Sequence, residues 1–229
     1  MIILHYTGMA TGEAALVRLC DAEAKVSSHY LVEEDGRVFA LVDEEVRAWH
    51  AGVSFWRGER DINGCSIGIE IVNPGHEFGY RDFPDVQIEA VIALLDDVRA
   101  RWPILNSRIL GHSDVAPDRK QDPGERFPWR RLAQAGHGLW TDANPGEGHV
   151  LKEGDHGEGV MRLQADLLRF GYEQDAAGRF DAATRARIAA FQRHWVQSRV
   201  DGAANAATSA RLQALNALAL DEKAPHPQP

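Results

Sequence analysis

Two histidines and one aspartate have side chains that could bind one metal ion together. His5 and His112 each follow a short run of branched apolar residues, which is typical of a strand that ends at a cleft. Asp122 follows His112 by ten residues, in a polar loop held by two prolines that could turn back to offer a third ligand. Two neutral imidazoles and a carboxylate suit Zn²⁺, and three protein ligands leave a fourth position for water. Taken alone, a histidine at a strand end is more often a structural residue, so the spacing leaves both interpretations open.

Three strand-like segments could form the sheet that carries these side chains. They are residues 1–6, 29–42 and 65–73, all rich in branched apolar residues or phenylalanine. The second segment is interrupted at Glu34-Asp35-Gly36, where the Asp-Gly pair predicts a hairpin turn.

Helices are predicted between the strands. A helix is expected over residues 85–101, because apolar residues recur there at steps of three and four: Ile88, Val91, Ile92, Leu95 and Val98. A shorter helix is expected from Thr11, with three residues turned inward: Leu16, Leu19 and Cys20. Strands mixed with helices in this way predict an α/β or α+β layer structure around one sheet.

The composition changes after about residue 138. Residues 138–159 are dense in Gly, Asp, Glu and Asn, which is typical of a linker. Two amphipathic helical faces follow, and their residues are Val160, Leu163, Leu167 and Leu168, then Thr184, Ile188, Phe191 and Trp195. The segment 180–188 is echoed at 200–212, which predicts two similar helix starts packed together.

The predicted organisation has four parts. A first domain spans residues 1–140, a linker 141–158, a small all-α domain 159–218 and a disordered tail 219–229.

Composition excludes several classes of function. With 229 residues and a net charge of −9, the chain lacks the basic surface that a nucleic-acid-binding protein needs. It contains no run of about 18 apolar residues and no export signal, so it is expected to be cytoplasmic, with the periplasm or cell envelope as the alternative. Cys20 and Cys65 are expected to be buried as small apolar residues, and their redox state is open.

Five motifs resemble one family in their order and spacing. They are LHYT, SSHYLVEEDGRV, RAWHAGVSFWRG, NGCSIGIEIVNPG and GHSDVAPDRKQDPGERFPW. Together they resemble the zinc-dependent N-acetylmuramoyl-L-alanine amidases of the amidase-2 family, and the AmiD-like branch in particular. The resemblance covers residues 1 to about 140 and implies a central mixed sheet flanked by helices, as in peptidoglycan recognition proteins. The segment 160–192 resembles a peptidoglycan-binding module.

The resemblance also implies roles for individual residues. It makes His5, His112 and Asp122 the ligands of one Zn²⁺, Glu70 the acid/base residue and Lys120 the group that stabilises the oxyanion. A carboxylate beside a zinc-activated water can accept a proton, and an ammonium can meet the charge that grows on a carbonyl oxygen. Without the resemblance, a glutamate in an alternating strand and a lysine in a loop are by default solvent-facing residues.

Three further residues are expected along the substrate groove: His50, Trp49 and Asn63. For His50, a packing role beside Trp49 is an equal alternative. Phage-type relatives have a catalytic tyrosine where this chain has Ser28, so the proton-transfer role is expected to rest on Glu70 alone.

The expected function is hydrolysis of the amide between N-acetylmuramic or anhydro-N-acetylmuramic acid and L-alanine, in peptidoglycan or muropeptides, by a monomer. One alternative is a non-catalytic muropeptide-binding protein of the same fold; another is a hydrolase that uses Cys65 or Cys20. The helical module is expected to act as a flexible tether to the wall, so its deletion from about residue 155 should spare hydrolysis of soluble muropeptides.

Overall fold

A five-stranded mixed sheet forms the centre of the N-terminal part of the protein. In the computed structural model, which describes residues 1–222, the strands are β1 (Ile2–Tyr6), β2 (Tyr30–Val32), β3 (Val38–Ala40), β4 (Ile67–Ile71) and β5 (Ile109–Gly111). Their order is β3-β2-β4-β1-β5. β1 pairs in parallel with both β4 and β5, β2 is parallel to β4, and the hairpin partner β3 is antiparallel. The predicted strands, hairpin and mixed sheet are confirmed.

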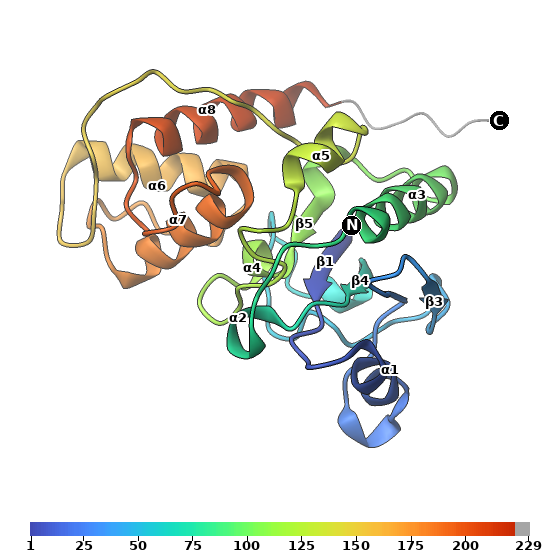
Figure 1. Ribbon diagram of the computed structural model, residues 1–229. Helices are drawn as coiled ribbons and strands as arrows, with labels where there is room; N and C mark the ends of the chain where they lie inside the picture. The colour runs from blue at the N-terminus through green and yellow to red at the C-terminus, as the bar shows by residue number, and fades with distance from the viewer. Residues whose placement is uncertain (223–229) are drawn as a thin grey trace.

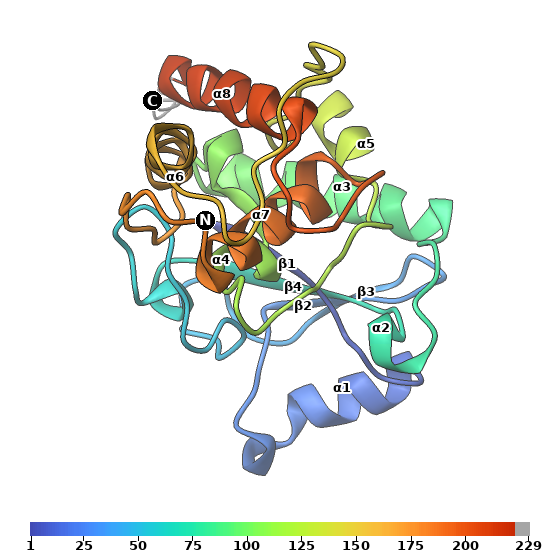
Figure 2. The ribbon, with the colours of Figure 1, turned by 90° about the vertical axis from the view of Figure 1, so that its left-hand side faces the viewer.

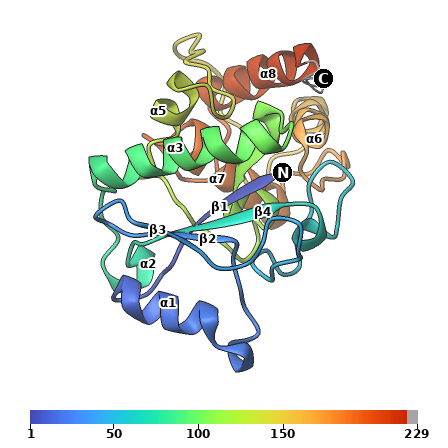
Figure 3. The same ribbon diagram turned by 90° about the vertical axis from the view of Figure 1, so that its right-hand side faces the viewer.

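Helices cover both faces of this sheet (Figure 3). The long helix α3 (Asp85–Arg101) lies on one face and α1 (Gly12–Cys20) on the other, and α2 (Gly75–Phe78), α4 (His112–Val115) and α5 (Trp129–Gln134) are short. The predicted inner face of α3 is confirmed, although Ile92 is only partly buried. Single-turn 3₁₀ helices follow α1 and precede β4 and β5, at residues 22–24, 62–64 and 106–108.

Both cysteines are exposed, which contradicts the expectation that they are buried. Cys20 is the last residue of α1, and its side chain lies on the outer side of the helix while Leu16 and Leu19 pack inward. Cys65 lies in the turn before β4, where its thiol donates to the carbonyl of Asp61 at 3.3 Å. Cys20 at a helix end and Cys65 in a turn both lie at the surface, so their side chains reach water although they are apolar.

Three helices make up the C-terminal part: α6 (Glu158–Phe170), α7 (Ala182–Trp195) and α8 (Ala206–Asp221). Their predicted apolar faces are buried except at Leu168, which is 51% exposed on the outer side of α6. Residues 219–221, expected in a disordered tail, belong to α8, and Glu222 accepts hydrogen bonds from two backbone N–H groups near β5. Residues 223–229 lie outside the described chain.

The predicted internal repeat is a repeated capping arrangement. Asp181 accepts a hydrogen bond from the backbone N–H of Thr184 at the start of α7, and Asn205 does the same for Thr208 at the start of α8, both at 2.8 Å. In each case a buried glutamine of the preceding helix donates to the threonine hydroxyl and accepts from a glycine N–H. These glutamines are Gln164 and Gln192. The two halves of the module therefore satisfy their buried polar groups in the same way.

The helical module packs directly onto the sheet domain (Figures 1 and 2). One apolar cluster contains residues from both parts, among them Ile3, Leu110 and Val115 on one side and Phe170 and Trp195 on the other. Trp56 of the first domain lies edge-on to Phe170, with ring centroids 5.7 Å apart. This packing differs from the expected flexible tether, because a freely moving module would expose both sides of the cluster to water.

A buried polar contact adds to this interface. His194 of α7 is stacked between Trp129 of α5 and Trp195, with ring centroids 3.5 and 3.6 Å away. Its Nδ1 lies 2.7 Å from the carboxylate of Asp114 in α4, which also accepts from the hydroxyl of Tyr172 at 3.3 Å. Without the module, Asp114 would lose these two partners and keep the backbone N–H of Gly111 at 2.8 Å.

No helix among residues 1–222 is long and apolar enough to cross a membrane.

Deleting residues 155–229 should destabilise the remaining domain rather than leave it intact. Each large apolar side chain that becomes exposed should cost about 1.5–3 kcal/mol. The free energy of unfolding should therefore fall by ~3–6 kcal/mol, and Tm by roughly 10 °C or more. Thermal unfolding and binding of an apolar dye measure the two effects. A matched control is Leu168→Ala in the full chain, which removes an exposed side chain. An unchanged Tm for the truncated protein would contradict the interface described above.

Candidate functional site

The sheet brings His5 and His112 to the same edge. β1 and β5 are parallel and pair Leu4 with Gly111, so the residues that follow, His5 within β1 and His112 at the start of α4, lie next to each other. The loop that follows α4 turns back over this edge, where the backbone N–H of Ser113 donates to the carbonyl of Asp122 at 2.9 Å. Gly111 makes this close approach possible, because a Cβ there would lie 2.8 Å from the ring of Pro123.

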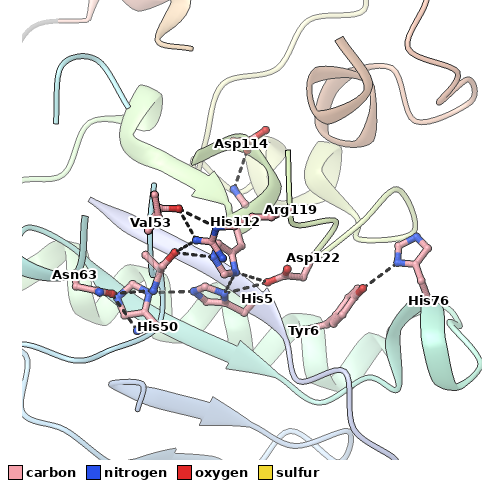
Figure 4. A network of polar contacts seen from close by, with 12 residues as sticks. His5, Tyr6, His50, Val53, Asn63, His76, His112, Asp114, Arg119 and Asp122 are labelled. Atoms are coloured by element: carbon pink, nitrogen blue, oxygen red, sulfur yellow. Dashed lines mark hydrogen bonds and ion pairs between the residues drawn. The ribbon is translucent and has the colours of Figure 1, made fainter. Parts of the chain in front are cut away.

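The three predicted ligands converge on one point (Figure 4). His5 Nδ1, His112 Nδ1 and Asp122 Oδ2 lie 3.0 Å from one another in all three pairs. All three side chains are buried, and no other cluster of this kind is found among residues 1–222. In a tetrahedral zinc site, bonds of 2.0–2.1 Å place the ligand atoms about 3.3 Å apart. The donor set and its spacing therefore fit Zn²⁺.

Hydrogen bonds on the far side of each imidazole decide where its proton lies. His112 Nε2 is 3.0 Å from the carbonyl oxygen of Ala51, which can only accept, so Nε2 carries the proton. His5 Nε2 is 3.0 Å from His50 Nδ1, and His50 Nε2 is 3.3 Å from the hydroxyl of Ser66, which itself donates to a carbonyl. Every group in this series of hydrogen bonds has a suitable partner when His5 Nε2–H donates to His50 Nδ1. Both Nδ1 atoms then face Asp122 as lone pairs, and three mutually close acceptors require a cation.

The charge state of the site agrees with this assignment. Burial, and then the neighbouring His112, lower the pKa of His5 to about 4 against the opposing effect of Asp122, so the His5 ring is neutral at pH 7. Burial alone would raise the pKa of Asp122, but the interactions with His112 and His5 hold it well below its usual range. The site therefore presents a neutral imidazole at His5 and an ionised carboxylate at Asp122.

His50 lies behind His5, one of the three predicted metal ligands. Its ring lies against β4 at Gly68, where a Cβ would come within 2.5 Å of the imidazole. The backbone N–H groups of His50 and Ala51 both donate to the side-chain oxygen of Asn63, at 3.0 and 2.8 Å. His50 also lines the cavity beside the three predicted ligands. Asn63 is buried, and its side chain holds the backbone of the segment that contains His50 and Ala51. Their roles in substrate binding stay predictions.

Glu70 lies beside His5. The two residues are register partners across β4 and β1, and Glu70 lines the same cavity as the three ligands. Its Oε2 atom is buried and has no hydrogen-bond partner among the described residues. Burial, and then the nearby charge of Asp122, raise the pKa of Glu70 well above its usual range. A carboxylate with a buried, unpartnered oxygen is suited to exchange a proton with a molecule in the cavity.

The cavity has a volume of about 680 Å³ and is open to solvent on one side. Lys120 lines it from the loop that carries Asp122, and Trp49 lines it as a rim residue that is 55% exposed. The aromatic face of Trp49 is covered on one side by the guanidinium of Arg47, 4.4 Å from the ring centroid. Tyr6 and His76 lie on the rim, joined by a 3.0 Å contact between the Tyr6 hydroxyl and His76 Nδ1.

Arg119 is a residue that sequence reasoning missed. Its guanidinium donates to the backbone carbonyls of Val53 and Ala51. The Ala51 carbonyl is the one that lies 3.0 Å from His112 Nε2. No pattern in the sequence signals this contact, because it joins a loop to main-chain atoms far away in the chain.

His29 and Ser28 are structural. His29 Nδ1 accepts from the N–H of Gly68 at 2.9 Å, and the hydroxyl of Ser28 donates to the Gly68 carbonyl at 2.7 Å. Ser28 is fully buried there and offers nothing to the cavity in place of a tyrosine.

Comparisons with known proteins agree with this site. Residues 1–125 match the family model of N-acetylmuramoyl-L-alanine amidases (Amidase_2), and residues 156–212 match a putative peptidoglycan-binding domain. The chain is 37% identical to the N-acetylmuramoyl-L-alanine amidase AmiD of Escherichia coli over 94% of its own length and 81% of the relative.

Two solved structures are similar over nearly the whole chain. The complex of Escherichia coli AmiD with anhydro-N-acetylmuramic acid-L-Ala-D-gamma-Glu-L-Lys has a TM-score of 0.81 and 35% identity, and covers 94% of this chain and 87% of the other. The complex of Pseudomonas aeruginosa AmpDh3 with an anhydromuramic pentapeptide has a TM-score of 0.79 and 30% identity, and covers 96% and 91%. With its buried His-His-Asp set in the matching domain, this chain belongs to the Amidase_2 family of N-acetylmuramoyl-L-alanine amidases.

Proposed function

We propose that this amidase binds one Zn²⁺ through His5, His112 and Asp122 and cleaves the amide between anhydro-N-acetylmuramic acid and L-alanine in soluble muropeptides. The observation that carries the proposal is the convergence of two proton-free Nδ1 atoms and a carboxylate at 3.0 Å, beside the buried, unpartnered Oε2 of Glu70. The substrate class follows from the two similar enzymes, whose complexes hold anhydromuramic peptides.

The bound metal would lower the pKa of a water towards neutrality and polarise the amide carbonyl. Glu70 would accept the proton of the attacking water at Oε2 and return it to the nitrogen of the leaving L-alanine. The Lys120 ammonium, which lines the same cavity, would lie near the carbonyl oxygen and oppose the negative charge that develops there. His50 would keep His5 in the tautomer that leaves Nδ1 free.

The proposed active unit is the monomer, since every group named above comes from one chain. A purely recognising protein is the weaker candidate, because binding alone would not require a free buried carboxylate beside a complete ligand set.

Replacing His5 with alanine should remove bound zinc, because two ligands rarely hold the ion against water. Gly68→Ala should weaken zinc binding by roughly 10- to 100-fold without touching a ligand, since its methyl group would displace His50 and loosen His5. Metal content after dialysis and zinc titration by calorimetry measure both effects. Gly58→Ala serves as control, because a Cβ there meets no atom within 4 Å. Full zinc content in His5→Ala would contradict the ligand assignment.

The reaction itself can be tested on two substrates, anhydromuropeptides and intact sacculi, with products identified by mass spectrometry. We expect release of free peptide beginning with L-alanine from the soluble substrate, loss of this activity in EDTA and recovery when Zn²⁺ is restored. Turnover that persists after the metal has been removed would rule out the zinc mechanism. Preferential cleavage of sacculi would overturn the proposal that the substrates are soluble.

Glu70→Gln should retain zinc but lose activity by a factor of roughly 10²–10⁴, because the amide is nearly the same size and cannot accept the water proton. Metal content and kcat are measured on the same preparation. A near wild-type kcat would remove Glu70 from the mechanism, and loss of zinc would assign it a structural role instead.

A further inference from the structure

A second cavity lies on the other side of the loop that carries Lys120. Its volume is about 290 Å³, and it is an open hollow lined by this loop and by helix α7 of the C-terminal module. Three residues line both this cavity and the larger one at the metal site: Arg119, Lys120 and Gln121. The two hollows are therefore neighbours that share one wall.

Helix α7 gives this second cavity a basic side. Arg185, Ala189 and Arg193 recur at steps of four residues on one face of the helix, with Ala186 beside them. The alanines leave room between the arginines. Arg185 is paired with Glu153 at 3.0 Å, which leaves Arg193 as the unpaired arginine on this face of the helix among the described residues.

Arg193 is partly buried and makes no direct ion pair with another described residue. No carboxylate of the described residues forms an ion pair with it, and its hydrogen-bonding partner is the side-chain oxygen of Gln121 at the long distance of 3.5 Å. Burial lowers the pKa of its guanidinium, with Glu125 acting in the opposite direction. A cation that has lost part of its hydration gains most from an anion that arrives with a ligand.

Contacts before and after Arg193 in the sequence hold it against the loop that carries Lys120. Before it in α7, Arg187 pairs with Asp118 at 3.1 Å. After the helix, the Gln197 amide donates to the backbone carbonyls of Glu125 and Phe127 at 2.6 and 2.7 Å. The module therefore follows the loop along the stretch that contains Lys120 and Asp122, and the position of Arg193 relative to them is set before any ligand binds.

The chemistry of the proposed substrate supplies a suitable anion. The muramic sugar is neutral once its lactyl carboxyl is in the scissile amide, so negative charge must come from the peptide. In the L-Ala-D-γ-Glu-L-Lys peptide of the similar AmiD complex, the γ-linkage leaves the glutamate α-carboxylate free. This carboxylate lies about two residues, or roughly 7 Å, beyond the scissile bond, which is within reach of a neighbouring hollow.

We propose that Arg193 of the C-terminal module, together with the loop at Lys120 and Gln121, forms a subsite for a carboxylate of the stem peptide. The inference rests on the proposed amidase function. It makes the module a wall of the substrate cleft, in addition to any affinity it has for peptidoglycan.

The test compares full-length zinc-loaded wild type with Arg193→Gln on three soluble substrates. These are the anhydromuramyl tripeptide, the same compound with the glutamate α-carboxylate converted to an amide, and the compound with an amidated C-terminus. On the unmodified substrate, Arg193→Gln should raise KM about tenfold with kcat nearly unchanged, as expected for loss of a charge-assisted hydrogen bond. Wild type should lose the same factor on one amidated substrate, and Arg193→Gln should lose nothing further there. Whichever amidation shows this pattern identifies the carboxylate.

Two controls separate binding from structure. Arg169→Gln removes an exposed arginine of the same module that pairs with Asp166 at 3.2 Å, and should leave KM unchanged. Arg193→Lys should recover part of the affinity, since it restores the charge. An unchanged KM in Arg193→Gln, an equal loss on all three substrates, or a fall in Tm or zinc content would overturn the subsite.

Failure of the proposed function would be visible separately, as the absence of peptide release by wild type. In that case, calorimetric binding of the free tripeptide L-Ala-D-γ-Glu-L-Lys to wild type and Arg193→Gln still decides the inference. Equal affinities would refute it.

Discussion

The structure depends on a local electrostatic conflict that the fold itself creates. Three hydrogen-bond acceptors, two imidazole nitrogens and one carboxylate oxygen, are held 3.0 Å apart in a buried place, and the protons that could reconcile them are engaged elsewhere. Hydrogen bonds to His50 and to the Ala51 carbonyl keep those protons on the outer nitrogens. The repulsion that remains is what gives such a site its affinity for a divalent cation.

The strands and glycines around the site allow the three acceptor atoms to approach one another closely. Parallel pairing of β1 with both neighbours places His5 next to Glu70 on one side and next to the β5 end, with His112, on the other. Glycines at positions 68 and 111 let the His50 ring and the ligand loop approach the sheet closely. The absence of a side chain at these two glycines is therefore as necessary to the arrangement as the predicted ligands themselves.

Much of this arrangement could be predicted from the sequence, because its signals are local. The apolar period of α3, the Asp-Gly hairpin and the repeated caps of α7 and α8 are set by residues close together in the chain. The ligands were predicted from family motifs, since a separation of 107 residues between two histidines carries little physical information. The contacts that could not be predicted join distant segments, Arg119 with Ala51 and His194 with Asp114. The exposure of both cysteines was not predicted either. Packing between domains leaves no periodic trace in either one.

The stack of Trp129, His194 and Trp195 has a consequence for how such proteins evolve. Trp129 belongs to the first domain, and His194 and Trp195 belong to the helical module. A substitution on one side of this contact therefore affects the packing of the residues on the other side. Exchange of the helical module for an unrelated one would leave Asp114 and Trp129 facing a surface that does not fit them. Recombination at the linker, although the chain is irregular there, is therefore constrained by selection at a distance. The two domains should drift together, as one inherited unit.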